Sequence, residues 1–186
     1  MYGLVNAAFR ELVVSKHGPN KWQEIRQKIG ISSDEFTAME SYPDDLTYQM
    51  VLHGSEVIGM PSEELLAAFG EFWVTYTDQE GYGSLFEIAG DSLADFLLSL
   101  DELHVRVGRN FPKLKPPSFQ FDVIDRTTLR MHYFTTRAGL CPFVLGLLKG
   151  LSHRFCTPLD VQSQACRALG DDHCVFLLKL GEKRAP

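Results

Sequence analysis

The sequence predicts an α+β fold, with a helical N-terminal half and a mixed C-terminal half that contains an antiparallel β-sheet and a packed helix. Up to about residue 110, apolar residues recur every three to four positions, which is typical of amphipathic helices. After the proline-rich link FPKLKPPS, short segments rich in aromatic and β-branched residues are typical of strands. With 186 residues, 45% of them hydrophobic, the chain can bury one core, so we expect a single domain over residues 1–186.

The helices of the first half are indicated by their apolar faces and end signals. A first helix ends at Gly18, and a second starts near Asn20. A third starts at Pro61 and Ser62, which are followed by two glutamates, as is typical of a helix N-terminus. A fourth starts near Asp91, and its inward stripe consists of Leu93, Leu97, Leu100, His104 and Val107.

The strands of the second half are predicted in two antiparallel pairs. FQFDVID and LRMHYFT flank the turn-like region at Arg126, and LDVQSQAC and CVFLLKL flank RALGDDH, which favours a hairpin around Gly170. Between the two pairs, AGLCPFVLGLLKGLSHRF has the pattern of a helix.

Charge and hydropathy exclude several classes of partner. The formal charge of −6 leaves no basic surface for a phosphate backbone, so we expect no nucleic acid. No uncharged apolar run approaches the roughly 18–20 residues needed to cross a bilayer, and Arg10 and Glu11 interrupt the start of the chain too early for a secretion signal. We therefore expect a cytoplasmic protein without a membrane partner, whose four cysteines are reduced, metal-bound or redox-sensing.

His104 lies on the apolar stripe of the fourth helix, where two interpretations compete. It is either a core histidine whose ring is held by a backbone carbonyl, or an axial ligand of a metal or haem iron. Haem iron requires a neutral imidazole on a rigid element among apolar side chains, and this stripe provides that setting.

A second group of polar residues lies in YFTTR, where Tyr133, Thr135 and Arg137 occupy alternate positions. On a strand this spacing places a phenol, a hydroxyl and a guanidinium on one face, which suits carboxylates, although a strand end with a solvated arginine has the same pattern. Together with His104, these donors match the iron and the two propionates of a porphyrin. The combination predicts a haem between the two halves of the chain.

Four motifs occur in order with family-like spacing: MYGLVN, LDELHVRV, FPKLKPPSF and HYFTTR. Together they resemble the H-NOX (haem nitric oxide/oxygen binding) family, which also forms the sensor region of soluble guanylate cyclase. The resemblance implies haem b (iron protoporphyrin IX), with a distal helical subdomain over about residues 1–60 and a proximal, mixed subdomain over about 61–186.

The resemblance also implies residue roles. His104 matches the proximal haem ligand, and Pro117 matches the proline that presses on the porphyrin. Tyr133, Thr135 and Arg137 match the Tyr-x-Ser-x-Arg triplet that holds the propionates, with threonine in place of serine. The distal pocket of the family corresponds to Leu4, Phe9, Trp73 and Phe143.

The expected gas is nitric oxide, with carbon monoxide as a second ligand and little dioxygen. Bound dioxygen needs a hydrogen-bond donor, and oxygen-binding relatives supply a tyrosine on the helix after the arginine. No tyrosine lies between Ala138 and Gly150, and Phe143 cannot donate, although Trp73 keeps an indole N–H. The resemblance implies that nitric oxide weakens the iron–His104 bond and so shifts the helical half relative to the Pro117 side.

The chain is expected to be a sensor and not an enzyme, since little sequence follows the second hairpin. The signal would act in trans on a histidine kinase or on a diguanylate cyclase or phosphodiesterase. Two other classes remain open: a haem-free small-molecule module of the vinyl-reductase type, which has no need of His104, and a haem peroxidase, which requires a distal acid–base pair.

Three cysteines are expected to meet near the second hairpin. Cys166 and Cys174 are equally distant from Gly170, so they oppose each other on adjacent strands, and Cys141 can join them. They are small buried hydrophobes, zinc ligands or a redox-sensitive pair. CRALGDDHC resembles the tail of H-NOX members that hold a structural zinc with these three cysteines and a histidine. The position of that histidine is occupied by Ser163 in this chain. His173 or Cys156 could therefore be the fourth ligand.

Overall fold

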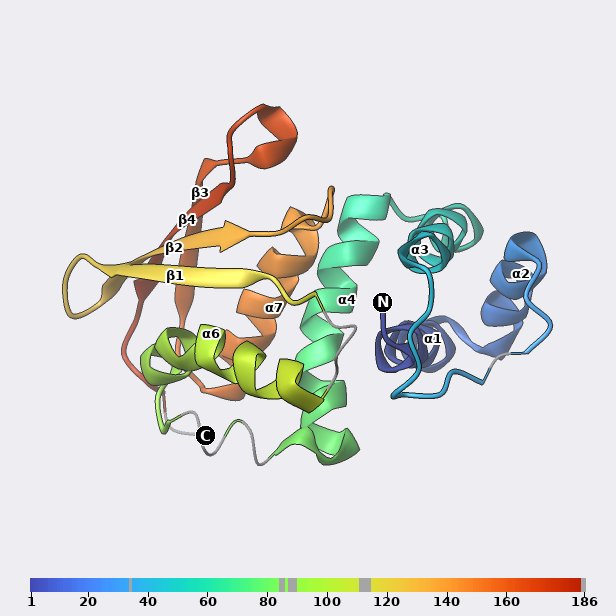
Figure 1. The fold of residues 1–186 in the computed structure, drawn as a ribbon, viewed down its shortest axis with the longest axis horizontal. Helices are drawn as coiled ribbons and strands as arrows, with labels where there is room; N and C mark the ends of the chain where they lie inside the picture. The colour runs from blue at the N-terminus through green and yellow to red at the C-terminus, as the bar shows by residue number, and fades with distance from the viewer. Residues whose placement is uncertain (34, 84–85, 87–89, 111–114, 185–186) are drawn as a thin grey trace.

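Three helices form one end of the molecule in the computed structural model, which describes residues 1–33, 35–83, 86, 90–110 and 115–184. They are α1 (Gly3–His17), α2 (Pro19–Ile29) and α3 (Asp44–Ile58), and they lie on the opposite side of the molecule from the sheet (Figure 1). Their inward faces form one apolar cluster, in which Phe9, Ile25 and Met50 are completely buried. This cluster is the core of the helical end.

Helix α3 is an element that the sequence analysis does not single out. Pro43 precedes it, Asp44 and Asp45 occupy its first turn, and Gly59 ends it in the left-handed conformation with φ +76°. Acidic residues near a helix N-terminus and a glycine just beyond the C-terminus are ordinary end signals. The pattern was therefore present in the sequence.

Helices α4 (Ser62–Thr77) and α7 (Cys141–Arg154) lie side by side between the helical end and the sheet (Figure 1). Their backbones approach closely at two glycines. A methyl group on Gly146 would overlap the Ala67 carbonyl oxygen, and one on Gly70 would overlap the Phe143 carbonyl oxygen. Glycine is required at these positions because the facing backbone occupies the place of a side chain. A short π-helical segment, η1 (Asp78–Tyr82), continues α4.

The sheet has four antiparallel strands in the order β1-β2-β4-β3. These are β1 (Ser118–Val123), β2 (Thr128–Phe134), β3 (Leu159–Ala165) and β4 (Cys174–Leu180), and a short 3-10 turn, η2 (Arg167–Leu169), lies between β3 and β4. Alternate residues of β2 and β4 face inward, so that Met131, Tyr133 and Phe176 are buried. They form a second apolar cluster with α7 and with α6 (Leu93–Asn110).

The α+β class, the four helices named from the sequence, both strand pairs and the intervening helix are confirmed. One boundary differs: β2 ends at Phe134, so Thr135 and Arg137 lie in the loop after the strand and do not extend its face. The reason is local, since the Thr135 hydroxyl accepts the Arg137 backbone N–H at 3.1 Å and so forms a turn.

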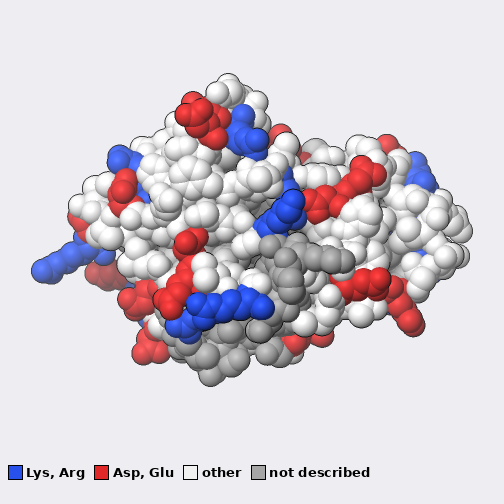
Figure 2. All heavy atoms as spheres, viewed as in Figure 1, with Lys and Arg blue, Asp and Glu red and all other residues white. Residues whose placement is uncertain are grey.

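The distribution of surface charge and the hydropathy of the helices agree with what the sequence predicts. Figure 2 shows acidic and basic side chains interspersed over the viewed face, without a broad area of one sign. Within the described ranges, no helix is both long enough and apolar enough to span a bilayer.

Candidate functional site

A cavity of about 360 Å³ lies between the helical end and the sheet. Its walls come from α1, α3, α4, α6, β1, β2 and α7, and most of the side chains on them are apolar. Every position of the predicted inward stripe of α6 from Leu97 onward lines it, namely Leu97, Leu100, His104 and Val107. A large apolar cavity with a few convergent polar groups is the usual form of a cofactor site.

His104 lies on this wall, and one of its two ring nitrogens makes a hydrogen bond within α6. Nδ1 lies 2.8 Å from the carbonyl oxygen of Leu100, one turn earlier in α6, and the ring stacks on Phe119 with 5.4 Å between centroids. Because a carbonyl can only accept, Nδ1 carries the proton and Nε2 keeps its lone pair. The carbonyl bond of the core-histidine interpretation is therefore present, and it leaves Nε2 available as a ligand.

Burial keeps this imidazole neutral. It lowers the pKa of His104 below the usual value, and the Leu100 carbonyl and the charge of Asp101 only partly oppose this effect. Asp101 itself accepts the backbone N–H of Phe119 at 3.0 Å, which ties α6 to β1. A neutral imidazole on a helix fixed in this way meets the requirement for a metal ligand.

Tyr133, Thr135 and Arg137 all line the same cavity, and we call this group the carboxylate fork. Burial raises the pKa of the Tyr133 phenol to about 12, while the Thr135 hydroxyl and the Arg137 charge act in the opposite direction. The phenol therefore stays protonated near neutral pH and can donate a hydrogen bond. The change of backbone direction after Phe134 still leaves the three side chains on one cavity wall.

Arg137 is held by an acidic residue that sequence reasoning missed. Its Nε lies 2.8 Å from Oδ2 of Asp44, its Nη2 lies 3.3 Å from Oδ1, and its Nη1 donates to the Lys115 carbonyl at 2.8 Å. The N-terminal ammonium of Met1 also contacts Asp44, at 2.5 Å. Burial disfavours the charged carboxylate, yet these hydrogen bonds and cations hold the pKa of Asp44 below its usual value.

Four of the other expected site residues also line the cavity: Pro117, Leu4, Trp73 and Phe143. Phe9 does not. Its ring packs edge-on against Phe69 with 5.3 Å between centroids, and Phe69 forms the wall in front of it. Phe9 thus supports the wall from behind.

Most hydroxyl groups on the helical side of the cavity already donate to protein acceptors. Thr47 donates to the Asn6 side-chain oxygen at 2.6 Å, Thr77 to the Trp73 carbonyl at 2.8 Å, and Tyr48 to the Ala138 carbonyl at 3.0 Å. Trp73 also lines the cavity, and among the described residues no acceptor is found for its indole N–H.

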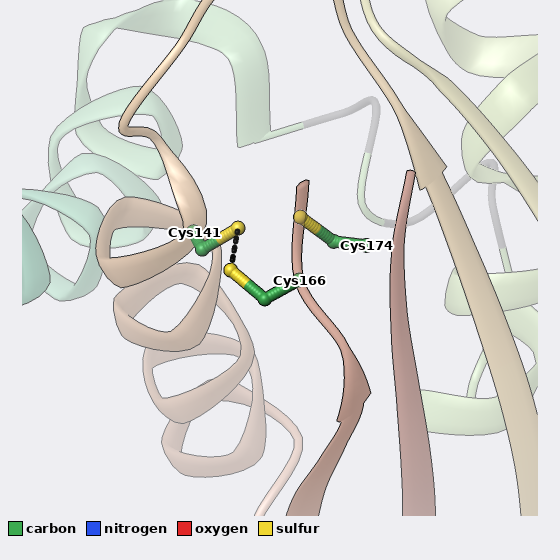
Figure 3. A group of neighbouring side chains, drawn as sticks. All are labelled: Cys141, Cys166 and Cys174. Carbon is green, nitrogen blue, oxygen red and sulfur yellow. Dashed lines mark hydrogen bonds between the residues drawn. The ribbon is translucent and has the colours of Figure 1, made fainter. Parts of the chain in front are cut away.

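Cys141, Cys166 and Cys174 meet at the end of the sheet, and we call them the thiol cluster (Figure 3). Their sulfur atoms all lie within 4.8 Å of one another, and those of Cys141 and Cys166 are 3.8 Å apart. Burial, together with the neighbouring Cys174 and Cys166 thiols, raises the pKa of Cys141. In the absence of a metal, Cys141 is therefore a protonated thiol.

Neither residue suggested as a fourth zinc ligand joins this cluster in the described part of the chain. The His173 ring stacks on Phe134 at 4.3 Å, and its Nε2 lies 2.9 Å from Nδ1 of His132. Cys156 follows α7, and Ser163 lies within β3. The three sulfur atoms thus form an incomplete tetrahedral ligand set.

The residues around the cavity fit a haem by their chemistry. The walls are apolar, a neutral imidazole with a free Nε2 faces the cavity, and a protonated phenol, a hydroxyl and a guanidinium provide donors for carboxylates. These are the three requirements of a porphyrin that carries an iron and two propionates.

Solved structures share this fold over the whole chain. A mutant H-NOX protein from S. oneidensis in the Fe(II) ligation state matches with a TM-score of 0.91 at 19% identity, over 99% of this chain and 98% of that chain. A mutant H-NOX protein from K. algicida in the unliganded Fe(II) state matches with a TM-score of 0.85 at 22% identity, over 98% of this chain and 97% of that chain. At these identities the likeness shows the fold.

Sequence comparisons show the family. Soluble guanylate cyclase gcy-35 of Caenorhabditis elegans is 35% identical over 158 residues, which cover 83% of this chain and 23% of the relative. Soluble guanylate cyclase gcy-32 of the same organism is 30% identical over 198 residues, which cover 99% of this chain and 29% of the relative. The chain thus spans less than a third of these relatives. The sequence model of the Haem-NO-binding family matches residues 2–163, and the chain belongs to this family.

Proposed function

We propose that the chain is a haem-based sensor that binds nitric oxide, and secondarily carbon monoxide, at ferrous iron, with little binding of dioxygen. The observation that carries the proposal is the free Nε2 of a neutral His104 on the wall of an apolar cavity that also contains the carboxylate fork. Haem content tests it directly: protein expressed with a haem precursor is expected to contain about one haem b per chain.

Each part of the cavity has a distinct task in this proposal. His104 would hold the iron, the carboxylate fork would donate hydrogen bonds to propionate, and Pro117 would contact the porphyrin. When bound, haem would supply an iron that takes a diatomic gas and whose bond to His104 nitric oxide would weaken. His104 would anchor α6 to the haem, and the hydrogen bond from Phe119 to Asp101 would pass a shift of α6 to β1.

The helical and mixed parts of the chain are proposed to move as two subdomains, a distal one over about residues 1–60 and a proximal one over about 61–186. Two apolar clusters support two bodies, since the helical cluster consists mainly of residues before 60 and the buried residues of the other cluster begin at Val74. They meet along α4, where Leu65 and Phe69 belong to the helical cluster and Val74 to the other. The same shift would signal in trans, to a histidine kinase or to a diguanylate cyclase or phosphodiesterase that binds one state better.

The selectivity against dioxygen is proposed to follow from the donors on the distal wall. Bound dioxygen is stabilised by a hydrogen bond, whereas nitric oxide and carbon monoxide need little such help. The hydroxyls of Thr47, Thr77 and Tyr48 are already committed to protein acceptors, and Phe143 has none. The indole N–H of Trp73 is a remaining donor, and a hydrogen bond from it to bound dioxygen would reduce the selectivity.

Replacing Phe143 with tyrosine is expected to create dioxygen binding. The new phenol would enter a cavity wall where the present ring packs 5.1 Å from Phe69, and one added hydrogen bond of about 1 kcal/mol raises affinity about fivefold. The measurement is the absorption spectrum of the ferrous protein in air. Phe143→Leu is the matched control, because it changes the packing without adding a donor. Equal oxygen spectra for the two variants would contradict the proposed selectivity.

The thiol cluster supports a second function, a zinc site or a redox-sensitive thiol group. Three sulfur atoms within 4.8 Å of one another favour a soft metal such as zinc, with the fourth position filled by water or by a residue that shifts. Two of the sulfurs, at 3.8 Å, are also close enough to form a disulfide after a small movement.

Protein purified without a chelator is expected to contain about one zinc per chain. Cys166→Ser is expected to remove it, since a thiolate ligand is lost, whereas Cys156→Ser is expected to leave it unchanged because Cys156 lies outside the cluster. Elemental analysis of the three proteins measures this. A wild-type protein without zinc would eliminate the metal site and leave only the redox interpretation.

A further inference from the structure

The charged groups around Arg137 can balance only one of the two carboxylates of a porphyrin. Among the described residues that line the cavity, the arginine is Arg137 and the lysine is Lys115. The guanidinium of Arg137 is already paired with the carboxylate of Asp44 through two N–O contacts of 2.8 and 3.3 Å. The Met1 ammonium shares the same Asp44 carboxylate, so these three groups together keep a single positive charge, whereas a porphyrin brings two carboxylates.

Lys115 is the cation at this place that has no acidic partner among the described residues. Its backbone carbonyl accepts Nη1 of Arg137 at 2.8 Å, so the two residues adjoin at the cavity. Its side chain is exposed, and no ion pair of Lys115 is found within the part of the chain that the structure describes, where the nearby Asp44 pairs with Arg137. Pro116 and Pro117 follow it directly, and their fixed φ angles restrain the backbone from which the side chain extends.

We propose that Lys115 is a second carboxylate-binding cation of the cavity, which pairs with one propionate while the carboxylate fork holds the other. This rests on the proposed haem function and adds a residue to the binding site. The lysine ammonium is a point charge on a flexible stem, so it can reach a carboxylate at the cavity mouth without a fixed geometry.

Other cations near the fork are less suited to this task. The N-terminal ammonium of Met1 lies 2.5 Å from Asp44, which it shares with Arg137, so the two cations together leave one positive charge for one carboxylate. Arg167 donates to the Thr135 carbonyl at 2.6 Å, but it is not one of the residues that line the cavity. Burial keeps His104 neutral. Lys115 therefore supplies the charge that the second carboxylate requires.

The test compares the rate at which haem leaves the full chain with the rate for haem dimethyl ester, in which both propionates are uncharged. Transfer to excess apomyoglobin measures each rate in the wild type, Lys115→Gln, Lys115→Arg and Lys179→Gln. Lys179, exposed on β4 and absent from the cavity wall, provides the matched control. Since a partly exposed ion pair contributes up to about 1 kcal/mol, Lys115→Gln is expected to release haem about two- to fivefold faster.

The other variants and the ester show whether the rate of haem release changes through the lysine charge or through packing. Lys115→Arg and Lys179→Gln are expected to keep the wild-type rate for haem, and all four proteins are expected to release the ester at one common rate. A wild-type haem rate for Lys115→Gln, or an equal acceleration for haem and its ester, would overturn the role of Lys115 while leaving the haem function intact. A wild type that takes up no haem would overturn both.

Discussion

Replacing His104 with glycine is expected to lower haem affinity by at least about tenfold, equivalent to ~1.4 kcal/mol, and added imidazole is expected to restore it. The substitution removes the ring whose Nε2 faces the cavity and leaves a space that free imidazole can fill. In the rescued protein the iron has a ligand that is not attached to α6. Regulation of a partner by nitric oxide should therefore be lost even though haem is present.

The control for this experiment is Val105→Gly. Val105 neighbours His104 on α6 but is 52% exposed, so its replacement carries the same cost of glycine in a helix, about 1 kcal/mol, without touching the cavity. Haem absorbance, with and without imidazole, measures both variants. If His104→Gly held haem as well as Val105→Gly in the absence of imidazole, His104 would not be the iron ligand.

Gly146→Ala is expected to destabilise the fold by at least about 2 kcal/mol, because the added methyl group has no space. It would overlap the Ala67 carbonyl oxygen, a backbone atom in the middle of α4 that cannot move aside like a flexible side chain. Separation of α4 and α7 would also displace Trp73 and Phe143, which line the cavity on these two helices. We therefore expect a lower haem content as well.

Gly108→Ala is the matched control for Gly146→Ala. Gly108 lies in α6, and apart from the backbone of its own helix no atom of the described residues lies within 4 Å of the position that its added methyl group would take. Removal of a helical glycine there is expected to stabilise the protein by up to about 1 kcal/mol. Urea unfolding followed by circular dichroism gives the free energy of unfolding of each protein. Equal stabilities for the two variants would contradict the close crossing of α4 and α7.

Local periodicity was enough to predict most of the fold. The stripe that ends in Leu100, His104 and Val107 identified α6 and its inward face, and the aromatic and β-branched residues of LRMHYFT beside the turn-like region at Arg126 identified β2. The order of the strands, with β2 next to β4, depends on pairing between residues that lie far apart in the chain, such as Met131 and Phe176. No short segment of sequence contains that information.

Site residues could be named from the sequence where the type of side chain indicates its role. Residues whose role depends on a contact with a distant part of the chain could not. His104 and the carboxylate fork were named from the sequence because together they match the iron and the propionates of a porphyrin and the motifs of the H-NOX family, and the structure places all four residues on the wall of one cavity. Asp44 was missed since nothing in its neighbourhood indicates that it pairs with Arg137, 93 positions away. For the same reason the family resemblance placed Phe9 in the distal pocket, whereas its ring packs against Phe69 and does not line the cavity.

The absorption spectrum of the ferrous protein, recorded first in air and then with nitric oxide, tests the central claim most directly. We expect a Soret band that air leaves unchanged and that nitric oxide shifts to the form without a histidine ligand, because the bond to His104 breaks. A folded protein without any Soret band would contradict the haem function and favour a haem-free small-molecule module. A stable ferrous–oxy spectrum in air would contradict the selectivity for nitric oxide.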